Sequence, residues 1–314
     1  MDNVLTRNNT EPVVSVGPVV LAVPGRAVAL QLRISFPLAG GDLPIILLSH
    51  GQGRSNNLSS MNGYGPLVQA WAAQGFVVIQ PTHLSSRTLQ LDPATPGAPL
   101  FWRSRAEDMR LILDQLGTIE AAVPALAGRL DPSRVAVAGH SMGGHTAGLL
   151  LGAQLLDEEG AQVSLAEPRI RAGVLLAAPG DGGGSLSAYA TENLAFFRHP
   201  SFAEMTTPAL VVVGDHDVST HLTTRGAAWH ADPYYLSAGS KSLLTIVGGE
   251  HGLGGISGYD AAETTDEHPA RVALVAQLTG AYLRTALDPD DGSWPLASQA
   301  LQAHVPSLGY IESK

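Results

Sequence analysis

Residues 134–144 read RVAVAGHSMGG, an apolar run that leads directly into a glycine-rich turn. The run 134–138 predicts a short buried strand, and the small residues of 143–156 predict a helix. A serine that acts as a nucleophile projects from such a strand-to-helix turn, where a strained backbone needs small neighbours. Ordinary glycine-rich turns share this pattern, but the strand and helix around it are the context that a nucleophile requires. We therefore predict that Ser141 is a nucleophile.

The same alternation of strand and helix extends over most of the chain. Short, continuous apolar runs predict buried strands, and segments with apolar residues three and four apart predict helices between them. Strands of this kind indicate a mostly parallel sheet covered by helices on both faces, so the predicted fold class is α/β. The predicted strands are 43–49, 76–80, 134–138, 172–177, 209–213 and 242–247, and the predicted helices are 66–74, 105–116, 143–156 and 269–287.

No internal repeat or charged linker divides the chain, although its 314 residues would allow one large domain or two. We predict a flexible N-terminal tail at residues 1–12 and a single α/β domain over 13–314. Residues 13–36 are typical of edge strands joined by turns. Two long connections rich in Pro, Gly and Ser, 84–104 and 180–207, are expected above the carboxyl ends of the strands, where they would shape a pocket.

The composition excludes several classes of protein. Hydrophobic residues make up 45% of the chain and charged residues 15%, so a globular chain is expected rather than a disordered one. The formal net charge is −10 and no basic run is present, which argues against a nucleic-acid partner. The absence of cysteine excludes disulfides, zinc–thiolate sites, iron–sulfur sites and a cysteine nucleophile.

The N-terminal residues and the apolar runs bear on cellular location. Residues 1–7 lack the basic and then apolar pattern of a signal peptide, and no apolar run in the sequence is long enough to span a membrane. We therefore expect a cytoplasmic protein without a membrane span. A processed secreted form remains open, and the sequence does not indicate an oligomeric state.

A nucleophilic serine needs a base, and the base needs an acid that orients it. Two aspartates follow the predicted strand 209–213 in the motif GDHD, and a histidine follows the predicted strand 242–247 in the motif GGEHG. The chain order of serine, aspartate and histidine is one in which this catalytic machinery occurs. We predict that His251 is the base and that Asp215 or Asp217 is the acid.

These motifs resemble those of the α/β-hydrolase superfamily over about residues 13–287. The segments are most similar to those of the dienelactone-hydrolase, platelet-activating-factor-acetylhydrolase and chlorophyllase-like groups. The resemblance implies an acid in a Gly-x-x-Asp arrangement, which favours Asp217 over Asp215. The motifs that carry the resemblance are HGQG at 50–53, GHSMGG at 139–144, GDHD at 214–217 and EHG at 250–252.

The oxyanion formed by attack on a carbonyl needs N–H donors. The first predicted donor is the backbone N–H of Met142, directly after the nucleophile. The resemblance to hydrolases with a His-Gly-x-Gly loop implies Gln52 as the second. Bulky apolar residues near predicted strand ends are candidates for the wall of an apolar pocket, although a place in the core suits each of them equally well. These candidates are Phe101, Trp102, Phe196, Phe197, Leu253 and Ile256.

Together the motifs and the resemblance predict a serine hydrolase that cleaves a carboxylic ester of a small molecule through a covalent acyl-enzyme. Cleavage of a lactone, an amide or a carbon–carbon bond, and acyl transfer, stay open because one fold can support all of them. A non-catalytic ligand-binding protein on the same scaffold is a more distant alternative.

No cofactor and no metal ion are predicted. The glycine-rich segments 180–184 and 248–255 lack the dinucleotide-binding pattern, and no Walker lysine pattern is present. The 11 histidines include no pair with metal-ligand spacing on a predicted helix. His145 is expected to pack in the core or to touch the pocket, and His230 is expected in a loop without an identifiable partner.

Overall fold

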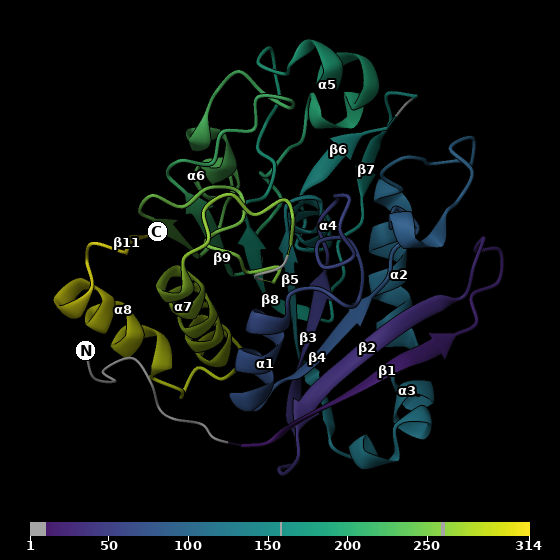
Figure 1. The fold of residues 1–314 in the computed structure, drawn as a ribbon, viewed down its shortest axis with the longest axis vertical. Helices are drawn as coiled ribbons and strands as arrows, with labels where there is room; N and C mark the ends of the chain where they lie inside the picture. The colour runs from purple at the N-terminus through teal and green to yellow at the C-terminus, as the bar shows by residue number, and fades with distance from the viewer. Residues whose placement is uncertain (1–10, 158, 259–260) are drawn as a thin grey trace.

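The computed structural model describes residues 11–157, 159–258 and 261–314, so the first ten residues of the predicted tail lie outside the described residues. Among the described residues, one sheet contains nine strands (Figure 1). In spatial order these are β1 (Val13–Leu21), β2 (Leu30–Pro37), β4 (Val77–Pro81), β3 (Leu43–Ser49), β5 (Leu130–His140), β8 (Ile170–Leu176), β9 (Ala209–Gly214), β10 (Lys241–Ile246) and β11 (Gly309–Ser313).

The central part of this sheet is parallel. From β4 through β3, β5, β8 and β9 to β10, each strand pairs with its neighbour in the parallel sense. Antiparallel pairing occurs only at the two edges of the described sheet, between β1 and β2, β2 and β4, and β10 and β11. The structure is therefore an α/β fold with a mostly parallel central sheet.

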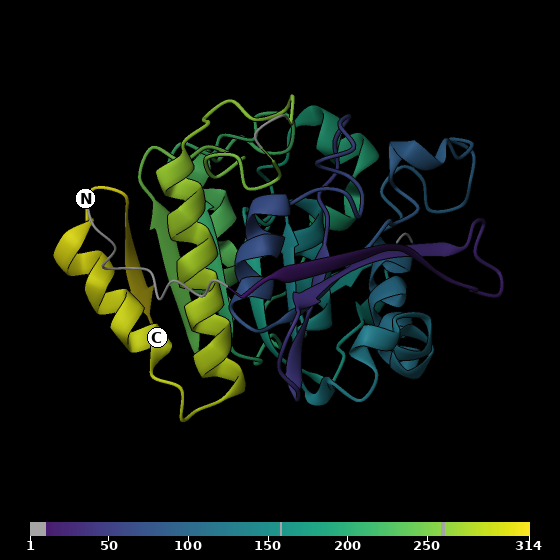
Figure 2. The same ribbon diagram turned by 60° about the horizontal axis from the view of Figure 1, so that its bottom comes forward.

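Helices cover both faces of the sheet. On one face α1 (Gly65–Ala73) and α7 (Pro269–Leu287) lie side by side, as Figures 1 and 2 show. The opposite face packs against α2 (Trp102–Asp114), α3 (Leu116–Ala122) and α4 (Met142–Leu150). The smaller elements are α5 (Ala188–Asn193), α6 (Asp232–Tyr235), α8 (Ser293–His304), β6 (Gln154–Leu156), β7 (Gln162–Ser164), η1 (Arg87–Leu89), η2 (Pro124–Leu126), η3 (Ala195–Phe197) and η4 (Ala227–Ala231).

Strand β3 shows why a continuous apolar run is needed in the centre of the sheet. Ile45 and Leu47 pack with the α2, α3 and α4 side chains, whereas Ile46 and Leu48 pack with those of α1 and α7. Successive side chains of a strand point to opposite faces, so a strand with helices on both sides is apolar at every position. Burial of each such side chain contributes about 1.5–3 kcal/mol.

The six predicted strands are confirmed within a few residues, and so are the predicted helices 66–74, 105–116 and 269–287. The predicted helix 143–156 is wrong in its last part, because α4 ends at Leu150 and β6 follows. Gly152 has a left-handed φ of 113°, and its N–H donates to Leu149 O, which closes the helix. The apolar residues beyond this glycine resemble a continuation of the helix in sequence alone.

Two C-terminal elements, α8 and β11, were not predicted. β11 pairs with β10 and extends the sheet at its edge, and α8 packs beside α7. An edge strand that is half exposed has no continuous apolar run, and the burial of β11 is correspondingly mixed.

The two long connections meet at the start of α4. Met142 packs in one apolar cluster with residues of the 180–207 connection, and with Leu100 and Trp102 at the end of the 84–104 connection. Since Met142 follows β5, this cluster lies at the carboxyl edge of the sheet. The members from 180–207 are Leu186, Ala190, Leu194, Phe196 and Phe197.

Candidate active site

The turn after β5 holds Ser141 in a conformation that few side chains adopt. Ser141 has φ 55° and ψ −120°, and its N–H donates to Leu176 O at 2.9 Å. Such a backbone costs about 1–3 kcal/mol for a residue other than glycine. Helix α4 begins at the next residue, so the partial positive charge of its N-terminus lies beside the serine hydroxyl. The turn thus presents a half-buried hydroxyl at the carboxyl edge of the sheet.

Glycine at two positions allows this turn to pack tightly. A Cβ built on Gly143 would lie 2.0 Å from Ser49 O, and one built on Gly139 would lie 2.0 Å from Gly143 O. Real Cβ atoms do not come within 3.0 Å of such neighbours. The close contact at Gly143 also shows that the Ser141 turn lies directly against the end of β3.

We expect Gly143→Ala to lower the free energy of unfolding by about 3 kcal/mol or to prevent folding, because the added methyl overpacks a backbone contact. Chemical denaturation measures this change. Gly148→Ala in the same helix is the matched control, since its Cβ would lie at an ordinary 3.6 Å from Leu175 Cδ2. That control should equal or exceed the parent in stability, by up to about 1 kcal/mol. Equal stabilities for the two variants would contradict the steric argument.

His251 connects two groups that lie far apart in the sequence. It follows β10, and its Nε2 lies 2.9 Å from Ser141 Oγ while its Nδ1 lies 2.9 Å from Asp217 Oδ2. An ionised carboxylate only accepts hydrogen bonds, so the proton of the neutral ring is on Nδ1. The lone pair of Nε2 therefore faces the serine hydroxyl. The structure brings the three predicted triad residues together in this way.

Asp217, and not Asp215, is the carboxylate that contacts His251. Asp217 is 1% exposed. Burial alone would raise its pKa, but the contacts with His230 and His251 outweigh burial and hold the pKa of Asp217 well below its usual range. Asp215 is exposed, and its Oδ1 accepts from Gly248 N–H at 2.6 Å. The second aspartate of the motif GDHD is therefore the one directed at the histidine.

A second histidine, His230 in η4, contacts the same carboxylate. Its Nε2 lies 3.3 Å from Asp217 Oδ2, and its Nδ1 lies 2.9 Å from Ala178 O. A carbonyl only accepts, so Nδ1 carries a proton and ties the ring to the segment after β8. The expectation that His230 has no partner is wrong. No local pattern marks this residue, because its partners Ala178 and Asp217 follow two different strands, β8 and β9.

Tyr64 and His140 join the loops around Ser141. The Tyr64 hydroxyl accepts from Gly51 N–H at 2.9 Å and lies 3.0 Å from His140 Nδ1. His140 Nε2 lies 2.8 Å from His251 O. Burial is the main cause that lowers the pKa of His140 to about 3, so the ring stays neutral and Nε2 donates to the carbonyl. Tyr64 was not singled out from the sequence.

The two predicted oxyanion donors are unpaired. In the described part of the structure, neither Met142 N–H nor Gln52 N–H donates a hydrogen bond to a protein acceptor. Met142 is the first residue of α4, and Gln52 lies on the loop whose start, Ser49, touches Gly143. The side chain of Gln52 turns away to donate to Ser85 O at 3.0 Å. Both amides are thus available to an acceptor that enters the site.

Three of the six pocket candidates belong to the apolar cluster at Met142, and a fourth precedes one of them in the chain. Phe196 and Phe197 pack against the His145 ring, with centroid distances of 5.6 and 5.2 Å, and Trp102 stacks on Phe196 at 6.2 Å. Both ring nitrogens of His145 lack a hydrogen-bond partner among the described residues. Burial lowers the pKa of His145 to about 3, so this ring is a neutral, largely apolar wall. The fourth candidate, Phe101, is buried next to Trp102 at the start of α2.

Leu253 and Ile256 lie elsewhere. Both are fully buried in the core cluster that also contains Trp71 of α1 and the apolar residues of α7. These two side chains of the loop after His251 therefore pack in the core. A position near a strand end in the sequence does not tell whether a side chain lines a pocket or packs in the core.

Asp217, His230 and His251 are the one group within the described ranges whose side-chain atoms lie close enough to hold a metal ion, all within 4.8 Å of one another. Hydrogen bonds account for this arrangement. The ring nitrogens of His251 lie within hydrogen-bond distance of Asp217 and Ser141, and His230 Nδ1 donates to the carbonyl of Ala178.

Comparisons with known proteins do not assign the chain to a family. No protein-family model matches the chain, and no curated protein shows significant sequence similarity to it. Within residues 11–157, 159–258 and 261–314, no helix combines the length and apolar character needed to cross a membrane.

Proposed function

We propose that this chain is a serine hydrolase that cleaves carboxylic esters of small molecules through a covalent acyl-enzyme. The observation that carries the proposal is the hydrogen-bonded chain in which His251 lies 2.9 Å from both Ser141 Oγ and Asp217 Oδ2. Placement of the three residues after β5, β9 and β10 supports the further proposal that the architecture is that of the α/β-hydrolases.

In the acylation step, Ser141 Oγ attacks the ester carbonyl carbon while His251 Nε2 takes the hydroxyl proton. The ring then carries a positive charge, which the buried carboxylate of Asp217 stabilises. As the tetrahedral intermediate collapses, the bond to the alcohol oxygen breaks. His251 returns the proton to that oxygen, so the alcohol leaves neutral and the acyl group stays on the serine.

We assign the stabilisation of the negative charge that develops on the carbonyl oxygen to the free N–H groups of Met142 and Gln52. Donors that are already in place cost no reorganisation during the reaction, and each such donor is worth about 10²–10³ in kcat. The N-terminal charge of α4 acts in the same direction. In the second half of the reaction, water attacks the acyl carbon and gives a proton to His251. The bond to Ser141 Oγ then breaks, His251 returns the proton to that oxygen, and the carboxylic acid is released.

The apolar cluster beside the nucleophile favours an ester with an apolar acyl or alcohol group. Phe196, Phe197 and Trp102 supply aromatic surface next to Met142, and His145 adds a neutral ring. Sites of this kind bind mainly through apolar contact, with a few polar groups that orient the reacting bond.

Labelling with a fluorophosphonate, followed by an ester panel, tests the proposed function. We expect stoichiometric modification of Ser141 and turnover of p-nitrophenyl esters, with a preference that depends on acyl and alcohol size. Added alcohols would divert product to new esters if the chain is an acyltransferase. Binding of esters without labelling or turnover would overturn the enzyme proposal in favour of a ligand-binding protein.

A further inference from the structure

Arg105 of α2 is a fully buried cation whose partners are uncharged oxygen atoms. Its Nη1 donates to His50 O at 2.7 Å and its Nη2 donates to Gly51 O at 2.9 Å. Nε donates to Ser85 Oγ at 3.2 Å. In the described part of the chain, no carboxylate lies within ion-pair distance of this guanidinium. Burial of a charge without a direct counter-ion is costly, so this arrangement calls for a specific role.

The bonds from Arg105 determine which way one peptide group points. Gly51 O accepts both from Arg105 Nη2 and from His50 Nδ1, at 2.9 and 2.7 Å. The backbone N–H of His83 donates to His50 Nε2 at 3.0 Å, which confirms that the His50 proton is on Nδ1. A trans peptide is planar, so its C=O and N–H point in opposite directions. With Gly51 O held toward the buried guanidinium, the Gln52 N–H points away from it and stays unpaired.

We propose that Arg105 is a positioning residue, whose guanidinium orients the Gly51–Gln52 peptide so that the Gln52 N–H faces the developing oxyanion. This inference rests on the proposed ester hydrolysis and deepens it. Arg105 does not touch the substrate and acts through the peptide that it holds.

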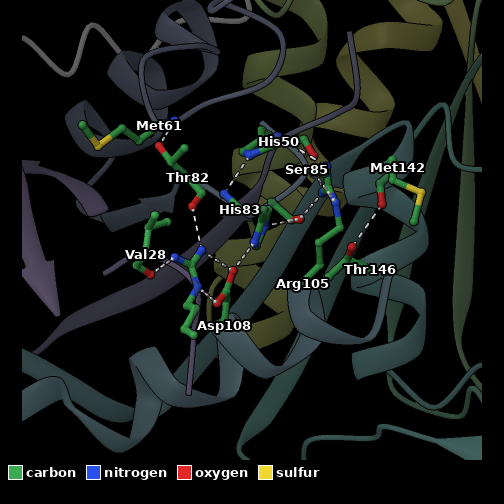
Figure 3. Close-up of polar contacts among 12 residues, drawn as sticks. Val28, His50, Met61, Thr82, His83, Ser85, Arg105, Asp108, Met142 and Thr146 are labelled. Carbon is green, nitrogen blue, oxygen red and sulfur yellow. Dashed lines mark hydrogen bonds and ion pairs between the residues drawn. The ribbon is translucent and has the colours of Figure 1, made fainter. Parts of the chain in front are cut away.

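A second buried network holds Arg105 itself in place (Figure 3). Ser49 Oγ, 3.4 Å from Arg105 Nη1, lies 2.9 Å from His83 Nε2, and His83 Nδ1 lies 2.9 Å from Asp108 Oδ2. Arg26 Nε completes the network with a 2.9 Å bond to Asp108. Although this serine–histidine–aspartate series has the geometry of a catalytic triad, its members are at most 3% exposed, so a substrate has no access to it. It serves to connect α2 with the ends of β3 and β4.

The charges of this region also favour an oxyanion. Arg26 and Arg105 face a single carboxylate, Asp108. Burial and nearby guanidinium charge hold the pKa of His50 and of His83 well below the usual range, so both rings are neutral. Burial lowers the pKa of Arg105 to about 9, so the guanidinium stays protonated near neutral pH. The Arg105 guanidinium therefore stays positive beneath the oxyanion loop, while the carboxylate of Glu263 accepts from the N–H groups of Arg54 and Ser55 farther along that loop.

The test compares Arg105→Met and Arg105→Lys with the parent in steady-state hydrolysis of a p-nitrophenyl ester. We expect Arg105→Met to lower kcat by about 10²-fold with little change in KM, as loss of one oxyanion donor does. Arg105→Lys keeps the charge but lacks the fork that binds two carbonyls, so we expect a smaller loss of about tenfold. If the methionine variant does not fold, Arg105→Lys still tests the role of the guanidinium.

A trifluoromethyl ketone separates positioning from general loosening, because its adduct with serine places an oxyanion in the same site. Its inhibition constant should rise in proportion to the loss of kcat/KM. Arg129→Met is the matched control, since Arg129 also donates to backbone carbonyls, those of Pro37, Ala39 and Gly40, but at the opposite end of β5. That variant is expected to keep the parent kcat and inhibition constant even if its melting temperature falls.

Folded Arg105 variants with the parent kcat and the parent inhibition constant would overturn the positioning role and leave the proposed hydrolase intact. A change in KM alone would overturn it as well. A parent protein that neither hydrolyses esters nor binds the ketone would overturn the proposed function, and the role of Arg105 with it.

Discussion

Ser141→Ala is expected to lower kcat for p-nitrophenyl ester hydrolysis by about 10⁵–10⁶-fold, because Ser141 Oγ is the hydroxyl that the described structure places against His251 Nε2. A residual rate above that of water should persist, since the free N–H groups of Met142 and Gln52 would still bind the oxyanion. The loss should appear in kcat and not in KM. Steady-state kinetics, with fluorophosphonate labelling to count active sites, measures it.

Ser141→Gly provides the companion measurement. Both variants lack the nucleophile and should be equally inactive, but glycine adopts the observed φ of 55° without the strain that alanine keeps. We expect the glycine variant to be more stable than the alanine variant by about 1 kcal/mol in the free energy of unfolding. Full turnover in either variant would rule out the proposed mechanism.

Asp217→Asn is expected to lower kcat by about 10⁴-fold. An amide can donate as well as accept, so His251 can turn to the tautomer that has its proton on Nε2. That tautomer cannot take the proton of Ser141. Measurement of kcat, together with the pH dependence of kcat/KM, tests this expectation. A loss restricted to KM would contradict this assignment.

Asp215→Asn is the matched control for the acid. Asp215 lies on the same loop but is exposed and bonded to a backbone N–H, away from His251. We expect kcat to stay within about twofold of the parent, as for surface substitutions in general. Equal losses in the two variants would mean that the loop conformation, rather than the carboxylate on His251, is what the substitutions disturb.

Much of the fold could be predicted because it depends on local patterns. The buried strands were found from continuous apolar runs, and the nucleophile turn from glycines beside a serine. The predicted helix 143–156 was too long because only the backbone at Gly152 reveals where α4 ends. Strand β11 was missed because an edge strand depends on its neighbour β10 more than on its own apolar residues.

Some residues of the candidate site could likewise be predicted from local motifs, and others could not. Ser141 and His251 were predicted from motifs at strand ends, and the structure brings them together. The choice of Asp217 over Asp215 came from a resemblance, and the tertiary structure supplies the contact. Leu253 and Ile256 were candidates for a pocket wall but lie in the core, since proximity to a strand end does not tell which way a side chain points.

By itself the sequence determined the six central strands, the helices α1, α2 and α7, the α/β class, and the turn that carries Ser141, because each depends on residues close together in the chain. Only the tertiary structure decided that His230 contacts Asp217 and that Arg105 holds the Gly51 carbonyl. Those contacts join residues from different elements, Arg105 and Gly51 being 54 positions apart. These buried side chains come into contact because the parallel strands end at one edge of the sheet. No local sequence pattern predicts such a contact.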